Sequence, residues 1–248
     1  MTAPVLILDE TDSTNAEARR RAEAGEVGPL WIAARRQTAG RGRRGRQWGS
    51  DSGNLFTTLL LLTQKSPAEA AQLTFAASLA VADLLDRYVP PALVTIKWPN
   101  DVLLDGRKTS GILIESGRAP SGGLWLAVGI GVNLSQTPGE TERPATCIAE
   151  HLAHGVVSAP TVDEAAKALA EIFGVWLDRW MTLGFQPILD AWIARTPGLH
   201  GPCTARLTNE TLTGTADGVE ADGSLRLKLS DGSLRVISAG DVFFGEAA

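Results

Sequence analysis

The stretch QTAGRGRRGRQW, residues 37–48, has the composition of an anion-binding loop. Six arginines fall between Arg35 and Arg46, and glycines separate several of them. Glycine lets backbone N–H groups approach an anion, and guanidinium groups bind phosphate or carboxylate through paired hydrogen bonds. Six neighbouring cations also repel one another, and Trp48 offers an aromatic face to a base or sugar. A solvated charged loop is the alternative, but these two features favour an anionic, partly aromatic ligand such as a nucleotide.

The same loop contains a GxGxxG match at residues 40–45 that does not indicate a dinucleotide-binding fold. That fold needs the glycines to open a helix whose N-terminus faces a pyrophosphate. The residues that follow, QWGSDSG, are poor helix formers and lack a periodic apolar face. The acidic residue expected about 20 positions later is missing, and the chain has no GxxxxGK[ST] segment. The loop is therefore neither a dinucleotide fingerprint nor a P-loop.

Two further stretches carry residues suited to ligand binding. In KWPND, residues 97–101, Lys97 stands at the end of an apolar strand, where a lysine can meet a ligand and stay charged. A turn with an exposed lysine explains the same five residues equally well. In GIGVN, residues 129–133, glycines occupy strand positions that are normally bulky, which often marks the close approach of a ligand or of another backbone. Asn133 could bind an amide or hydroxyl there, or could complete a turn.

Composition limits the class of protein. The chain has 248 residues, 44% hydrophobic and 21% charged, as in an ordinary globular protein of one large domain or one medium and one small domain. Its net charge of −5 argues against a protein that coats nucleic acid. Cys147 and Cys203 are predicted to be free thiols, and His151 and His154 to be surface residues, so no metal ligand is assigned. No signal peptide or membrane span is evident, which predicts a cytoplasmic protein.

Hydrophobic periodicity predicts strands and helices in a mixed order typical of an α+β domain. A capping box is predicted at Thr14–Glu17, and a hairpin turn at Asp105-Gly106. Strands are expected at residues 5–8, 31–35, 54–62, 94–98, 102–104, 110–115 and 123–132, and helices from residue 14 to Gly25 and at 67–86, 161–183 and 185–194.

The hydrophobic pattern of the sequence changes near residues 196–198. Beyond this point come four short alternating segments, punctuated by Asp-Gly turns, at residues 203–207, 212–216, 225–229 and 234–237. About 50 residues of this kind predict a small β-barrel appended to the main domain. The predicted domains are therefore residues 1–198 and residues 199–248.

Five ordered motifs carry a resemblance to a known family. They are Ser13-Thr14-Asn15, Gln37 with GRGRRGRQW, KWPND, KTSGILIE at residues 108–115, and GIGVN. With them the chain closely resembles the bacterial biotin protein ligases, or biotin–(acetyl-CoA-carboxylase) ligases, in the form without an N-terminal DNA-binding domain. The resemblance implies a catalytic domain of the biotin/lipoate ligase type followed by an SH3-like barrel. It also implies an enzyme that uses ATP with Mg²⁺ to make biotinyl-5′-AMP and then modifies one lysine of biotin carboxyl carrier protein.

The resemblance also implies roles for individual residues. Lys97 and Arg43 correspond to the catalytic cations, while Asp101 and Gly111 fall in matched motifs without a definite role. The implied biotin contacts are Ser13, Thr14, Asn15, Gln37, Arg41, Gly42, Arg43 and Lys97, and the implied nucleotide contacts are Arg41, Arg43, Trp48 and Asn133.

Partners and alternatives follow from the same comparison. The carrier protein of acetyl-CoA carboxylase or a related carboxylase is the expected partner, with a homodimer possible and neither DNA nor membrane binding expected. A lipoate or octanoate ligase on the related fold, a non-catalytic biotin sensor and an Arg/Gly nucleic-acid-binding module are the rival hypotheses. Residues 240–244, GDVFF, depart from the Gly-Glu and nearby Arg of many relatives. No site residue is therefore assigned to the C-terminal domain.

Overall fold

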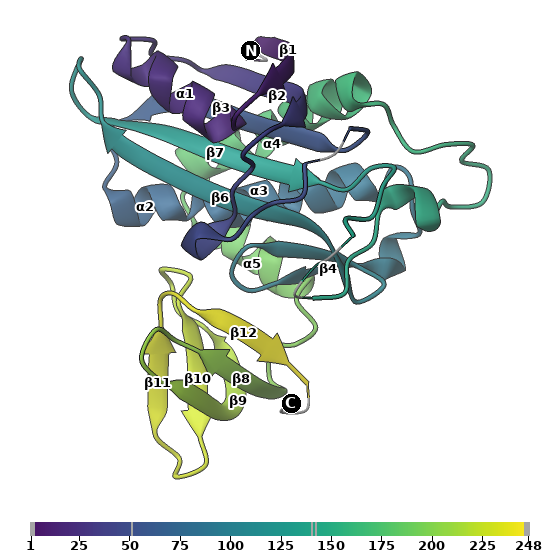
Figure 1. The fold of residues 1–248 in the computed structure, drawn as a ribbon. Helices are drawn as coiled ribbons and strands as arrows, with labels where there is room; N and C mark the ends of the chain where they lie inside the picture. Colours follow the sequence, from purple (N-terminus) through teal and green to yellow (C-terminus); the bar gives the residue numbers. More distant parts are fainter. Residues whose placement is uncertain (1–2, 51, 140, 142, 246–248) are drawn as a thin grey trace.

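The larger part of the protein is built on a seven-stranded mixed sheet. The computed structural model describes residues 3–50, 52–139, 141 and 143–245. The strands of this sheet are β1 Val5–Thr11, β2 Leu30–Gln37, β3 Leu55–Thr63, β4 Val94–Lys97, β5 Asp101–Leu104, β6 Arg107–Arg118 and β7 Leu124–Val132. Their order is β1-β2-β3-β7-β6-β5-β4 (Figure 1). Strands β1 and β2 are parallel, and every other neighbouring pair is antiparallel.

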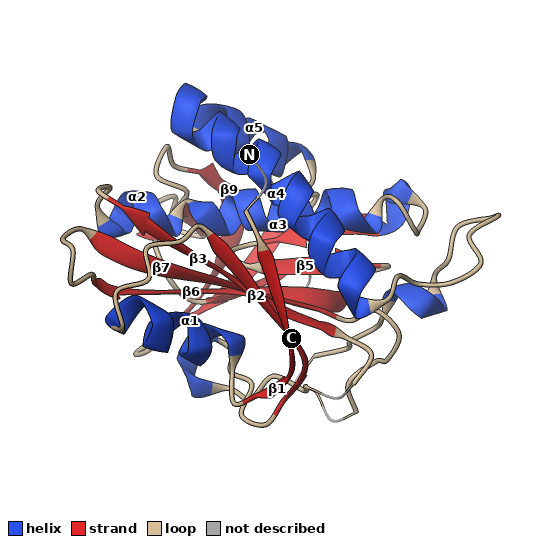
Figure 2. Ribbon diagram, turned by 90° about the horizontal axis from the view of Figure 1, so that it is seen from above, coloured by secondary structure: helices blue, strands red, loops and turns tan. Residues whose placement is uncertain are grey.

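Helices cover both faces of this sheet. They are α1 Thr14–Glu23, α2 Pro67–Ala71, α3 Leu73–Leu85, α4 Val162–Leu183 and α5 Gln186–Ala194, with short 3₁₀ turns at Arg43–Gly45, Pro91–Leu93 and Ile148–Glu150. Helix α1 packs on one face, and α3, α4 and α5 pack on the other (Figure 2). Strand β3 is buried along most of its length because it lies between these two layers. The apolar run predicted at residues 54–62 is thus a central strand, as its continuous hydrophobicity indicates.

A second, five-stranded antiparallel sheet follows α5. Its strands are β8 Pro202–Arg206, β9 Thr211–Val219, β10 Leu225–Leu229, β11 Leu234–Ile237 and β12 Asp241–Phe244, in the order β11-β10-β9-β8-β12. Figure 1 shows this sheet beside the larger one, with β12 on the side that faces it. Leu225, Leu227 and Val242 belong to the same hydrophobic cluster as the helices of the larger sheet. The predicted α+β class is confirmed.

Local signals in the sequence predicted several boundaries correctly. Asp105 and Gly106 adopt φ values of 52° and 71°, and this left-handed pair joins β5 to β6 in a hairpin. Thr161 caps α4 with a capping box, so the predicted start of that helix is also confirmed. The long helix predicted over residues 67–86 is instead two helices, because α2 ends at Ala71 and α3 begins at Leu73.

Two expectations were wrong. The capping box predicted at Thr14 is absent, because Ser13 is the N-cap of α1 and makes no side-chain capping hydrogen bond. The Thr14 side chain instead bonds to Gln37, a residue 23 positions away. Strand β12 was also missed, because four residues at the end of a small sheet carry too short an alternating pattern to be recognised.

One helical stretch, Pro67–Leu85, is long and apolar enough by composition to cross a membrane. Of its most apolar window, 67% is buried inside the fold. Helix α3 also contacts α4, α5 and strands of the larger sheet. Its apolar character is that of a helix in the protein core.

A buried indole connects the two sheets and gives a test of the fold. The Trp98 Nε1 donates a hydrogen bond of 2.9 Å to the backbone oxygen of Gly223, in the turn between β9 and β10. We expect Trp98→Phe to destabilise the protein by about 1–3 kcal/mol more than Trp192→Phe, because it leaves a buried carbonyl without a donor. Trp192 is a matched control, since it is fully buried and its Nε1 has no hydrogen-bond partner among the described residues. Urea unfolding of both variants measures the difference, and equal losses would contradict this role for Trp98.

Candidate active site

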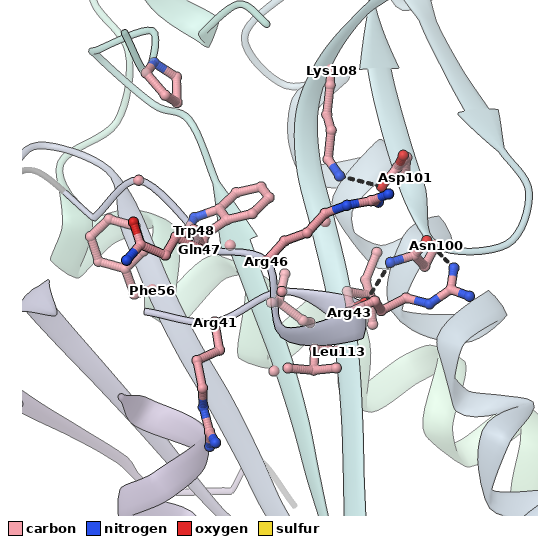
Figure 3. Close-up of a pocket in the computed structure, with 18 of the residues that line it drawn as sticks. Arg41, Arg43, Arg46, Gln47, Trp48, Phe56, Asn100, Asp101, Lys108 and Leu113 are labelled. Atoms are coloured by element: carbon pink, nitrogen blue, oxygen red, sulfur yellow. Dashed lines mark hydrogen bonds and ion pairs between the residues drawn. The ribbon is translucent and has the colours of Figure 1, made fainter. Parts of the chain in front are cut away.

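A pocket of about 450 Å³ lies against one end of the larger sheet. Its walls come from β6, β7, the start of α1, the arginine loop (residues 37–48) and Asp241 of β12 (Figure 3). Every residue that the sequence singled out lines it except Lys97, namely Ser13, Thr14, Asn15, Gln37, Arg41, Gly42, Arg43, Trp48, Asp101, Gly111 and Asn133. The fold thus brings together residues that lie far apart in the chain.

One end of the pocket, the neutral end, is bordered by a hydrogen-bonded network of uncharged side chains in which Glu115 is the one carboxylate. The backbone N–H of Thr14 donates to Gln37 Oε1 at 2.8 Å, and Asn15 Nδ2 donates to Glu115 Oε2 at the same distance. The Thr58 hydroxyl, fully buried on β3, lies 2.8 Å from the Thr14 hydroxyl and 2.7 Å from Asn15 Oδ1. These bonds fix the side chains before any ligand arrives, as a specific polar pocket requires.

Thr58 and Glu115 were not identified from the sequence. Thr58 belongs to a threonine pair in the otherwise apolar run NLFTTLLLL, and a buried polar residue in such a run is itself a signal. Glu115 ends the KTSGILIE motif and also lies 3.5 Å from Arg41. Glu115 therefore contacts both the neutral end of the pocket and the arginine loop.

Glycines of β6 and β7 form a flat floor beneath Trp48. Gly111 and Gly131 are paired across the two strands. A Cβ atom added to Gly111 would lie 2.8 Å from the Trp48 ring, and one added to Gly131 would lie 2.6 Å from it. A Cβ on Gly129 would likewise collide with the Asn15 side chain. The groups that approach these glycines are an indole ring and an amide of the protein itself, where the sequence predicted a ligand or another backbone.

The arginine loop is anchored to the second sheet. Arg43 donates to Asn100 Oδ1 at 2.9 Å, as Figure 3 shows, and to the backbone oxygen of Gly240 at 3.3 Å. Asp241 pairs with Arg46 at 2.6 Å and with Arg44 at 3.3 Å. Burial alone would raise the pKa of Asp241, but the hydrogen bond and charge of Arg46, with other arginines nearby, hold that pKa below its usual value. A residue of the C-terminal segment, to which the sequence assigned no site role, therefore lines the pocket.

Asp101 organises a second group of cations. Its carboxylate lies 2.6 Å from Lys108 Nζ, as Figure 3 shows. It also lies 3.3 Å from Arg143. Lys108 also approaches the Trp48 ring, with 5.3 Å between its Nζ and the ring centroid. Both cations line the pocket, and neither was identified from the sequence. The site thus presents positive charge from the arginine loop, from β6 and from the loop after β7.

Lys97 lies beside the pocket rather than in its lining. Lys97 stands opposite Asp101 in the register of β4 and β5. Its Nζ is buried and has no hydrogen-bond partner among the described residues. Burial lowers the pKa of Lys97 to about 8, because it disfavours the charged ammonium. Asp101 opposes this shift, whereas Arg143 and Lys108 add to it. A lysine that is buried and unpaired at a site is available to an anionic ligand.

Two other buried polar atoms of the pocket lack partners in the described part of the chain. Asn133 donates through Nδ2 to the Thr146 oxygen at 2.9 Å, but its Oδ1 accepts nothing there. The Trp48 Nε1 also has no acceptor. Buried polar groups are nearly always hydrogen-bonded, so these atoms identify positions where a ligand can bond.

The described residues contain no group of three or more His, Cys, Asp or Glu side chains that could hold a metal ion. Asp101 and Asp241 are both engaged by cations. The described side chains therefore do not fit a resident metal centre. The pocket itself is suited to a ligand with a neutral polar end, a central anionic part and a planar ring.

These features agree with the comparisons with known proteins. The chain belongs to the biotin/lipoate A/B protein ligase family, whose model matches residues 8–135. Residues 202–245 match the biotin protein ligase C-terminal domain. The chain is 43% identical over 245 residues to a biotin–(acetyl-CoA-carboxylase) ligase of Paracoccus denitrificans, covering 96% of this chain and all of that one. It is 32% identical to the bifunctional ligase/repressor BirA of Bacillus subtilis strain 168, covering 95% of this chain and 72% of that protein.

Solved structures give the same result for the fold. The biotin protein ligase of Aquifex aeolicus in complex with biotin and ATP matches 98% of this chain and 99% of its own, with a TM-score of 0.80 and 24% identity. The biotin protein ligase of Leishmania major in complex with biotinyl-5-AMP matches 95% of this chain and 99% of its own, with a TM-score of 0.62 and 26% identity. The arrangement of a main sheet and a C-terminal sheet is therefore that of this family.

The anchoring of the arginine loop can be tested by proteolysis. Asp241→Asn removes the carboxylate that pairs with Arg44 and Arg46. Because these arginines are partly exposed, we expect a loss of about 1 kcal/mol in loop closure, or about fivefold faster tryptic cleavage within residues 41–46. Asp9→Asn is the control, since Asp9 pairs with Arg35 while its own side chain is fully exposed. Cleavage of Asp241→Asn at the wild-type rate would contradict the anchor.

Proposed function

We propose that this chain is an ATP-dependent biotin protein ligase. It activates biotin as biotinyl-5′-AMP and then transfers the biotinyl group to a specific lysine of biotin carboxyl carrier protein. One observation carries the proposal: the same pocket is lined by the neutral polar end, by several cations and by the Trp48 indole, which lies on paired glycines. The full-length similarity to a biotin–(acetyl-CoA-carboxylase) ligase supports it, as do the complexes of relatives with biotin, ATP and biotinyl-5-AMP.

The neutral end is the proposed site of the biotin ring system. A ureido group has both N–H donors and a carbonyl acceptor, and the network of Thr14, Asn15, Gln37 and Thr58 presents fixed partners for such a group. Ser13 is buried at the start of α1 beside them. The hydrocarbon chain of lipoate or octanoate offers no hydrogen bond to this network and would place apolar carbons against buried polar groups, which discriminates against it. The same geometry therefore favours biotin over the related acyl substrates.

The opposite end is the proposed nucleotide site. Trp48 supplies an aromatic face, Asn133 an unpaired amide oxygen, and Arg41 and Arg43 positive charge near the phosphates. Gly42 leaves room for the backbone of the loop to approach the ligand, and Gly111 and Gly131 allow the indole to lie flat. Mg²⁺ is proposed to arrive on the triphosphate as part of the ATP substrate.

The first chemical step is an attack by the biotin carboxylate on the α-phosphorus of ATP. A new O–P bond forms, the bond between the α-phosphorus and the bridging oxygen breaks, and pyrophosphate leaves with the electron pair. Two anions repel by about 1 kcal/mol at 4 Å in water, and by several times more in a partly dry site. Lys97 and Arg43 are proposed to offset this repulsion and to stabilise the charge that develops in the transition state.

In the second step the carrier lysine attacks the acyl carbon of the mixed anhydride. An amide forms, AMP leaves with the electrons of the C–O bond, and the lysine nitrogen loses a proton. Neither step needs a nucleophile from this chain. The arginine loop is proposed to cover the adenylate and exclude water, because water would hydrolyse the anhydride.

Several predictions of the sequence analysis remain predictions. They are the division into domains at residues 1–198 and 199–248, a homodimer, the absence of DNA binding and a cytoplasmic location. The carrier is proposed to be that of acetyl-CoA carboxylase, from the name of the Paracoccus relative.

The decisive experiment is pyrophosphate–ATP exchange with Mg²⁺, run in parallel with biotin and with lipoate. We expect exchange with biotin alone, because the acyl-adenylate forms reversibly and the polar end of the pocket matches the ureido group. Exchange driven only by lipoate would overturn the choice of substrate while leaving the reaction class. Silence with both acids, together with measurable biotin binding, would favour a non-catalytic biotin sensor.

The role of Lys97 gives a second test. Lys97→Ala is expected to cost about 1.5–3 kcal/mol, or about 10- to 100-fold in kcat/KM for biotin, because a charged interaction with the carboxylate is lost. The ammonium must be protonated to bind an anion, so wild-type kcat/KM should be at its plateau well below pH 8 and fall as the pH rises through about 8. The variant should lack this decline. Lys65→Ala, which removes a surface lysine on the ring of Trp180, is the control, and wild-type behaviour of Lys97→Ala would remove Lys97 from the mechanism.

A further inference from the structure

The ring of Phe243 on β12 contacts three cationic side chains from separate parts of the chain. Lys97 Nζ lies 5.5 Å from the ring centroid, Arg143 Cζ lies 4.4 Å from it and Arg206 Cζ lies 4.6 Å from it. Lys97 comes from β4, Arg143 from the loop after β7, and Arg206 from β8. The ring therefore joins both sheets at the edge of the pocket, where Arg143 is part of the lining.

Packing in the hydrophobic core does not explain the position of the Phe243 ring. Val242 and Phe244, its neighbours on β12, both belong to the main hydrophobic cluster, and Phe243 does not. Side chains alternate along a strand, so Phe243 points to the other side of β12. It faces cations where its neighbours face apolar residues. Its contacts are those of a cation–π site.

The surroundings of Lys97 indicate what the Phe243 ring contributes to this site. The nearest carboxylate, Asp101, is occupied by Lys108 and Arg143, and the Lys97 ammonium has no hydrogen-bond acceptor among the described residues. Burial and the neighbouring cations both disfavour its charge. The negative face of an aromatic ring attracts an ammonium and favours its charged form. Phe243 supplies that attraction without a carboxylate, which would compete with an anionic substrate for the lysine.

We propose that Phe243 is a positioning residue for biotin activation, whose ring holds the charged ammonium of Lys97 at the edge of the pocket. The same ring also contacts Arg143. The inference rests on the proposed function, in which Lys97 binds the biotin carboxylate. It extends that function by making the second sheet a part of the activation site. Phe243 itself touches no reacting atom; it acts through Lys97.

The experiment measures biotin-dependent pyrophosphate–ATP exchange across pH in Phe243→Leu, Phe243→Trp and Phe244→Leu. A buried cation–π contact is worth about 3- to 30-fold in binding, so Phe243→Leu should lower kcat/KM for biotin by that factor. Its alkaline decline should also move to lower pH, because the ring no longer favours the ammonium. Phe243→Trp should restore both values, since an indole is the stronger cation–π partner. Phe244→Leu, the same change on the opposite side of the strand, should leave both at wild-type values.

The pH comparison depends on the charged and titratable groups that surround Lys97. The single Phe243 and Phe244 variants leave all of these groups unchanged. A double variant, Lys97→Ala with Phe243→Leu, isolates the coupling further: if Phe243 acts through Lys97, the second change adds little to the first. The charged or titratable neighbours of Lys97 are Asp101, Lys108, Arg143, Cys203, Arg206 and Asp241.

The possible outcomes are distinct. Wild-type kcat/KM and pH profile in Phe243→Leu would overturn the proposal, as would equal impairment in Phe243→Trp, which would indicate a requirement for shape alone. Additive losses in the double variant would also overturn it. If Phe243→Leu melts early, Phe243→Met, of similar volume and without a ring, takes its place. Loss of biotin-dependent exchange in the wild-type protein would instead remove the proposed function, and the role of Phe243 with it.

Discussion

The repulsion among cations at the pocket is the constraint on which the rest of the site depends. Arg43, Arg44 and Arg46 stand almost consecutively in the chain, and Arg43 and Arg46 line the pocket together with Lys108 and Arg143. Such a set is stable without a ligand only if protein groups offset part of its charge. Asp241 does this for the arginine loop, Asp101 for Lys108 and Arg143, and the Phe243 ring for Lys97. These two carboxylates do not balance all the cations of the set, so a net positive charge remains for an anionic ligand.

The neutral end of the pocket follows a different rule. Its hydrogen bonds join the start of α1 to Gln37 of β2 and to Thr58 of β3, and those to Thr58 are fully buried. The proposed recognition of a ring system there depends on the geometry of donors and acceptors rather than on charge. Glu115 is the link between the two regions, because one oxygen accepts from Asn15 and the other lies near Arg41. The neutral end of the pocket and the arginine loop therefore share one carboxylate.

The sequence predicted the site better than it predicted the contacts within it. Glycines and arginines in residues 37–48 and 129–133 were recognised because their composition is unusual in a folded core. Thr14 was misassigned as a helix cap because its partner, Gln37, lies on another strand, and no local rule includes such a partner. Lys97 is proposed to bind the ligand carboxylate, and its contact with the Phe243 ring was not predicted because β12 is too short to recognise. Asp241 was given no site role because residues 240–244 depart from the pattern of many relatives.

The anchor of the arginine loop has a consequence for synthesis of the chain. Arg46 and Asp241 are separated by 195 residues. Synthesis proceeds from the N-terminus at about 5–20 residues per second, so the loop emerges from the ribosome about 10–40 seconds before its anchor. During this interval the larger sheet can begin to fold around the neutral end of the pocket, while the loop has no second sheet to hold it. The chain thus completes the proposed binding surface for a ring before it can anchor the loop that is proposed to retain an activated product.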